Sequence, residues 1–165
     1  MTEQRQTRWL NEAQQRAWRA LVLGHTLLLD RLDDDLRESF GISLTEYEIL
    51  VRLSERPSHC MRMAHLAAAL AHSRSRVTHT IDRMEKAGYV VRTASPEDGR
   101  GVVATMTDEG MALLEQAAHV HVTGVREYLV DLAEPEDFEA MGRVMNASAD
   151  HLISAHPEME VRRSR

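Results

Sequence analysis

Apolar residues recur every three or four positions along most of this chain, which is the spacing of one face of an α-helix. From residue 8 to residue 38 the repeat contains no proline, and Gly41 follows as a suitable left-handed cap. The sequence therefore predicts one long helix over residues 8–38. The acidic run 33–35 near its end is interpreted as a solvated turn rather than a metal site. The apolar positions of the helix are Trp9, Ala13, Ala17, Ala20, Leu21, Leu27, Leu28, Leu32 and Leu36.

Two shorter helices are predicted from local start and stop signals. Ser43, with Glu46 three residues later, is typical of a capping box, in which each side chain bonds a backbone N–H group near the other. The helix that starts there would end at the proline-containing run 56–58, and a second is expected over residues 62–69. The buried positions of the first are expected to be Tyr47, Leu50, Val51 and Leu53.

A further helix, expected over residues 73–87 with Ser73 and Gly88 as its caps, has two unlike faces. One side is apolar and would be buried, because Val77, Ile81 and Met84 fall together on a helical wheel. The opposite face and its flanks carry Ser75, Arg76, Thr78, His79, Asp82, Arg83 and Lys86. The negative charge of Asp82 would be repelled by DNA phosphate. We therefore expect Asp82 on the solvent side or paired with a neighbouring arginine.

After Gly88 the apolar period changes from helical to extended. Residues 89–93 and 102–106 are rich in β-branched side chains, and the turn 95–101 between them contains a proline and two glycines. The sequence predicts a β-hairpin here. A long helix over residues 107–131 follows, and a last one begins at Pro135 and ends before Pro157.

Composition is that of one globular unit. The chain has 165 residues, of which 43% are hydrophobic and 28% charged, and these values are far from those of disordered chains. No apolar run approaches the roughly 20 residues of a membrane span, and no basic-then-apolar leader opens the chain. We therefore expect a cytoplasmic protein with no membrane partner.

Charge is unevenly distributed along the chain. The total is 20 basic against 26 acidic residues, a net charge of −6. From Arg56 to Arg100 there are eight basic and four acidic residues, so this segment carries +4 and the remainder −10. A basic centre in an acidic frame is typical of a localised anion-binding surface, although chance clustering would give the same count.

Nothing in the sequence indicates catalysis or metal binding. The single cysteine, Cys60, excludes a disulfide framework, and no activating cluster accompanies it to favour redox sensing. Nine histidines lack ligand spacing, since His119 and His121 are two apart and would point away from each other on a helix. Phosphate-binding glycine loops and nucleophile elbows are missing as well. We expect no enzyme, no metal and no cofactor.

A short helix, a turn and a second helix with a polar outer face form a helix-turn-helix, and a hairpin directly after it makes the motif winged. The DNA major groove, about 12 Å wide, admits one helix. We therefore predict that the chain binds double-stranded DNA; a winged fold that binds a protein partner instead is the alternative. The predicted DNA contacts are Arg62, Arg74, Ser75, Arg76, Thr78, His79 and Arg83.

The most specific motif is Asp98-Gly99-Arg100, followed after five residues by Met106-Thr107 and then by Gly110. Because of this motif, the chain resembles the MarR (multiple antibiotic resistance regulator) family of bacterial transcription factors. The family pattern is Asp-x-Arg, five residues, Leu-Thr and a glycine three residues later, so Met106 is its one conservative departure. Leu66-Ala67, Val77-Thr78 and residues 81–90 match the helix-turn-helix and its exit into the wing, and the resemblance spans about residues 9–153.

The resemblance implies a mainly helical winged helix-turn-helix fold with a small β-hairpin wing and long N- and C-terminal dimerisation helices. Residues 1–42 and 107–165 would dimerise, and residues 43–106 would form the DNA-binding lobe. The implied activity is that of a regulator, most often a repressor, that binds a pseudo-palindromic operator as a homodimer. Arg100 would enter the minor groove, and Asp98 would orient the wing by holding that arginine.

Two further expectations concern the long helices. Their apolar stripes are too large for a lobe of about 65 residues to cover, so they need another chain, and we assign Phe138 and Leu152 to that interface. The resemblance also implies a small aromatic or anionic effector that binds in a crevice between the dimer helices and the lobe. Candidate effector contacts are Trp9, Trp18, Arg19 and His25; dimer-core aromatics and surface polar groups are the simpler interpretation of them.

Overall fold

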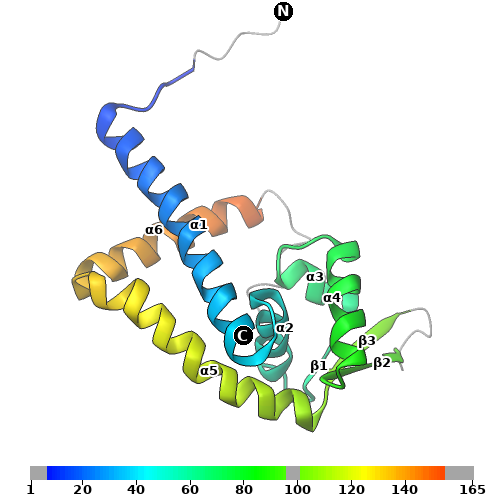
Figure 1. The fold of residues 1–165 in the computed structure, drawn as a ribbon. Helices are drawn as coiled ribbons and strands as arrows, with labels where there is room; N and C mark the ends of the chain where they lie inside the picture. Colours follow the sequence, from blue (N-terminus) through cyan, green and yellow to red (C-terminus); the bar gives the residue numbers. More distant parts are fainter. Residues whose placement is uncertain (1–6, 96–100, 155–165) are drawn as a thin grey trace, which may run out of the picture.

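The computed structural model describes residues 7–95 and 101–154, and these form long helices beside a compact lobe (Figure 1). The long helices are α1, α5 and α6, and the lobe holds three shorter helices and a small sheet. The predicted class, mainly helical with a winged helix-turn-helix, is confirmed. The elements in chain order are α1 (Glu12–Phe40), α2 (Leu44–Ser54), β1 (Cys60–Arg62), α3 (Met63–Ala69), α4 (Arg74–Lys86), β2 (Val90–Ala94), β3 (Val102–Met106), α5 (Asp108–Tyr128), the short 3₁₀-helix η1 (Val130–Leu132) and α6 (Pro135–Ser154).

Helix boundaries follow the capping residues. Ser43 and Glu46 form the predicted capping box of α2, and Gly41 closes α1 in the left-handed region with φ 70°. The predicted start of α1 at residue 8 is wrong, because Asn11 caps the helix through its own capping box. The predicted end of α5 at residue 131 is also too late, since the helix ends at Tyr128 and η1 follows. The proline expected to stop α6 lies outside the described residues.

The sheet has three strands rather than the predicted two. β1 pairs antiparallel with β3, placing Cys60 opposite Thr105, and β2 pairs with the other edge of β3 in the order β1-β3-β2. Cys60 therefore lies in a strand that the sequence did not predict. A three-residue strand carries no periodic signal of its own, and its partner lies more than 40 residues later in the chain.

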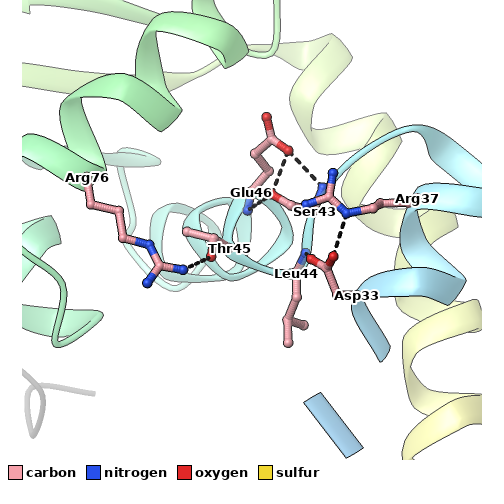
Figure 2. Close-up of polar contacts among 7 residues, drawn as sticks. All are labelled: Asp33, Arg37, Ser43, Leu44, Thr45, Glu46 and Arg76. Atoms are coloured by element: carbon pink, nitrogen blue, oxygen red, sulfur yellow. Dashed lines mark hydrogen bonds and ion pairs between the residues drawn. The ribbon is translucent and has the colours of Figure 1, made fainter. Parts of the chain in front are cut away.

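Within the acidic run of α1, Asp33 is structural, so the interpretation of the run as a solvated turn is wrong for this residue, whereas Asp34 is exposed as expected. Asp33 accepts a hydrogen bond from the backbone N–H of Leu44 at 2.7 Å and pairs with Arg37 within its own helix (Figure 2). Burial raises the pKa of Asp33, but the hydrogen bonds from Arg37 and Leu44 outweigh it and leave the pKa below its ordinary value. Asp33 thus fastens α1 to the first turn of α2.

The N-terminus of α5 docks closely against the end of the helix-turn-helix. The Thr107 hydroxyl donates to the carbonyl of Gly88 at 2.7 Å and accepts from the N–H of Gly110 at 3.0 Å. The Thr107 N–H donates to the carbonyl of Tyr89 at 3.1 Å. At Gly110 a Cβ atom would lie 2.3 Å from that same Tyr89 oxygen, so only glycine allows this approach.

The long helices leave apolar side chains uncovered by this chain. Trp18, Leu23 and Leu27 are exposed on α1, as are Val144 and Leu152 on α6. The buried core lies in the lobe and where α1 and α5 meet it. Over the described residues, no helix combines the length and apolar character needed to cross a membrane.

The turn between α3 and α4 contains an alanine in an unfavourable backbone conformation. Ala71 has φ 55°, a region that costs a residue with a Cβ atom about 1–2 kcal/mol. Glycine removes that cost, and part of the gain is offset by its greater freedom in the unfolded chain. We therefore expect Ala71→Gly to stabilise the protein by up to about 1 kcal/mol, or a rise in Tm of about 2–4 °C in a thermal melt.

The matched control is Ala112→Gly, an exposed position in the second turn of α5 with helical backbone. There the same replacement should destabilise by about 0.5–1 kcal/mol. A lower Tm for both variants would show that the turn at Ala71 is not strained.

Candidate nucleic-acid interface

α4 is built so that one face is buried and the other is open to solvent. The Ser73 hydroxyl accepts from the N–H of Arg76 at 3.2 Å and so caps the helix as predicted. Val77, Ile81 and Met84 are buried, again as predicted. Thr80 is buried with them, and its hydroxyl is satisfied by the carbonyl of Arg76 at 3.0 Å. The sequence did not single out Thr80, because threonine is a polar residue. It can be buried here only because its hydroxyl donates to a backbone carbonyl of the same helix.

The open face gathers the predicted DNA contacts of this helix. All six of them are exposed: Arg74, Ser75, Arg76, Thr78, His79 and Arg83. They divide into an outer edge and two flanks. Ser75 and His79 lie on the outer edge, opposite the buried face on a helical wheel.

One flank of α4 faces the wing. Arg74 and Thr78 line a small groove of about 280 Å³ with Arg62, which stands at the junction of β1 and α3. Gly101 and Val102, at the base of the wing, form another wall of this groove. The structure therefore brings two predicted basic contacts, from separate elements, to one hollow beside the hairpin.

The other flank faces α2. Arg76 donates through Nη2 to the Thr45 hydroxyl at 3.3 Å (Figure 2), and Arg83 donates through Nε to the Glu46 carboxylate at 3.3 Å. Sequence reasoning missed both partners, because they lie 31 and 37 residues away along the chain. Their only local signal is the capping box of α2, which fixes the first turn where Thr45 and Glu46 lie.

Asp82 is paired with an arginine, one of the two alternatives predicted for it. Arg92 on β2 contacts Asp82 at 2.8 Å and Glu85 at 2.6 Å, and its own N–H donates to Glu85 at 3.0 Å. The hydrogen bond from the Arg92 side chain lowers the pKa of Glu85. Arg92 thus joins the wing to α4 and removes acidic charge from the exposed face. Asp98 and Arg100, the predicted wing contacts, lie outside the described residues.

This arrangement matches known proteins. A family model described as MarR family matches residues 40–101, which span α2 to the base of the wing. The regulator PrsX of Escherichia coli is 31% identical over 130 residues, which cover 75% of this chain and 78% of PrsX. The chain belongs to the MarR family. The family resemblance predicted from the sequence is confirmed, and this MarR-family protein is a DNA-binding transcriptional regulator and not an enzyme.

Solved structures of relatives agree with this assignment. Sco3205, a MarR family regulator from Streptomyces coelicolor crystallised in complex with DNA, is 38% identical with a TM-score of 0.86, covering 90% of this chain and 92% of that one. AbsC, a MarR family regulator from the same organism, is 40% identical with a TM-score of 0.84, covering 90% of this chain and 99% of that one. The likeness therefore includes the long helices as well as the lobe.

A wide groove separates α1 of this MarR-family chain from the lobe. It has a volume of about 1130 Å³. Of the four predicted effector contacts, His25 lines it, whereas Trp9, Trp18 and Arg19 do not. Trp9 lies before α1, and Trp18 and Arg19 lie about two turns into it. All three are exposed, and their effector role stays a prediction. The ionisable residues along the groove are His25, Asp30, Asp33, Asp34, Arg37, Glu48, His72, Arg76, His79 and Arg83.

Burial shifts the pKa of three ionisable side chains near α2, one of which is Tyr47, whose pKa it raises. Burial raises the pKa of Glu48 in the groove wall, against the opposing pull of Arg52 and Arg76. Burial also lowers the pKa of His121 on α5, whose ring contacts Tyr47 of α2 with centroids 4.5 Å apart. Within the described ranges, no three His, Cys, Asp or Glu side chains come together as a metal site.

Proposed function

We propose that this MarR-family regulator is a homodimeric repressor that binds a pseudo-palindromic operator through α4 in the major groove and the wing in the minor groove. The observation that carries the proposal is the exposed polar face of α4, with Arg62 and Arg74 beside the wing. Arginine and serine side chains on one helix face are suited to base edges and phosphates. A protein bound at a promoter blocks RNA polymerase without needing a surface that binds the polymerase. We therefore favour repression over activation. Because its target is chromosomal DNA, we place the protein in the cytoplasm.

The uncovered apolar side chains support the dimer. Trp18 on α1 and Leu152 on α6 are 57% and 60% exposed in the single chain, and each belongs to a row of exposed apolar residues. Large apolar rows of this kind mark protein contacts. A second copy of the chain is the partner that gives two recognition helices, as a pseudo-palindrome requires.

The groove between α1 and the lobe is where we place an effector. It is bounded by helices that we assign to different tasks, since α1 dimerises and α4 reads DNA. A small molecule seated there would change the position of α4 relative to its copy in the dimer. DNA release then follows, because two half-sites must be matched at once.

The test is a selection from random duplex DNA with purified protein at about 150 mM salt. We expect an enriched inverted repeat whose half-site centres are about 10–10.5 bp apart. No enrichment from folded, dimeric protein would overturn the operator proposal. It would favour the alternative of a winged fold that binds a protein partner. Reporter transcription from the selected site, with and without the protein, distinguishes repression from activation.

Arg76 is expected to be a base-reading residue of this interface. Its hydrogen bond to the Thr45 hydroxyl is long and exposed, and threonine is a neutral partner. DNA can therefore replace this hydrogen bond at little cost in free energy. We expect Arg76→Ala to weaken operator binding by about 1–3 kcal/mol and to relax base preference at one position per half-site. Competition binding against single-base operator variants measures both effects. Arg143→Ala on α6 is the control, since it removes the same charge far from α4.

A lower affinity with an unchanged base profile would make Arg76 a phosphate contact instead. An unchanged affinity would remove it from the interface altogether.

A further inference from the structure

Arg83 extends from α4 toward a carboxylate that belongs to another helix. Its Nε lies 3.3 Å from Oε1 of Glu46, which is on the first turn of α2. The Arg83 side chain is 58% exposed and that of Glu46 only 12%. Among the described residues, this is the one ion pair that Arg83 makes, and it occupies only the Nε side of the guanidinium. The terminal N–H groups are left for a ligand such as phosphate.

Glu46 is held too firmly to move away from Arg83. Its other carboxylate oxygen accepts from the Ser43 N–H and from the Ser43 hydroxyl, both at 2.7 Å (Figure 2). These bonds are the capping box of α2, so the position of the carboxylate is tied to the start of that helix. A fixed negative charge therefore stands directly behind an exposed positive charge of the recognition helix.

We propose that Glu46 sets the strength with which Arg83 attracts DNA phosphate. It is a positioning residue that does not itself touch DNA. The proposal rests on the proposed function, in which Arg83 is a DNA contact. The carboxylate offsets part of the charge of the guanidinium, and so reduces both the Coulomb attraction to phosphate and the counterion release that drives binding. Since that electrostatic term is independent of sequence, Glu46 restrains binding to DNA of any sequence.

The test is Glu46→Gln, a change that removes the charge and keeps the cap, because glutamine serves equally well at the third position of a capping box. Binding to a random-sequence duplex of about 30 bp is measured from about 50 to 250 mM salt. We expect affinity to rise about two- to fivefold. The slope of log K against log salt should steepen by up to about 0.9, the value for one phosphate contact.

Two comparisons make the result specific to this pair. Glu139→Gln on α6 removes the same charge far from the lobe, and should leave the slope unchanged. In an Arg83→Ala background, Glu46→Gln should add nothing, because its effect passes through that arginine. A thermal melt of each variant checks that the fold is retained.

The outcomes separate this inference from the function on which it rests. If the wild-type protein binds DNA but Glu46→Gln changes neither affinity nor slope, or if the gain persists without Arg83, the inference is overturned and the proposed function stands. If the wild-type protein binds no duplex at any salt concentration, both are overturned.

Discussion

Gly110→Ala is expected to destabilise the protein by about 3 kcal/mol, at the upper end of what overpacking costs. The added Cβ atom would lie 2.3 Å from the Tyr89 carbonyl oxygen and 2.9 Å from the Met106 side chain. Methionine can move, but the carbonyl belongs to backbone that accepts the Thr107 N–H at 3.1 Å. The clash can be relieved only if α5 moves away from the turn that leads into β2. That movement breaks the hydrogen bonds of Thr107 to the Gly88 and Tyr89 carbonyls.

Guanidinium-induced unfolding followed by circular dichroism measures the loss. The control is Gly142→Ala in α6, where the atoms of the chain leave open space around the new Cβ. That replacement should stabilise by about 0.5–1 kcal/mol, the usual gain for alanine over glycine within a helix. Equal stabilities for Gly110→Ala and the wild type would mean that α5 is not docked as closely as the structure shows.

Local signals in the sequence were reliable because their physical basis is local. Ser43 and Ser73 cap helices as predicted, since each satisfies an N–H group within three residues of itself. Gly110 was recognised only as part of a family motif. The structure supplies the reason for it, a close approach to a carbonyl 21 residues earlier that no periodicity reveals.

Features that depend on distant partners could not be predicted. β1 exists because β3 pairs with it, and Asp33 is ordered because the N-terminus of α2 lies beside it. The same holds at the interface itself. The sequence placed Arg76 and Arg83 on α4 but could not show that both turn toward α2, since that depends on how two helices cross. The residue types indicated which side chains could contact DNA, and the packing of α4 against α2 decided where those side chains point.

Leu152→Glu is expected to raise the dissociation constant of the proposed dimer by a factor of about 10² to 10⁴. Leu152 is 60% exposed in the single chain and lies on the apolar side of α6 with Met141 and Met145, which are exposed as well. Burying a leucine contributes about 1.5–3 kcal/mol. A two-fold interface loses this contribution twice, once from each copy, so the total is about 3–6 kcal/mol before the cost of a buried charge.

Ala147→Glu is the matched control, because it introduces the same charge at an exposed position on the opposite side of α6. Sedimentation equilibrium of both variants and the wild type gives the dissociation constants. We expect the control to remain dimeric at micromolar concentration and Leu152→Glu to dissociate. DNA affinity should fall with it, because one recognition helix cannot match two half-sites. An unchanged dissociation constant for Leu152→Glu would show that α6 is not part of the interface. The apolar row of α1 would then be the surface to test.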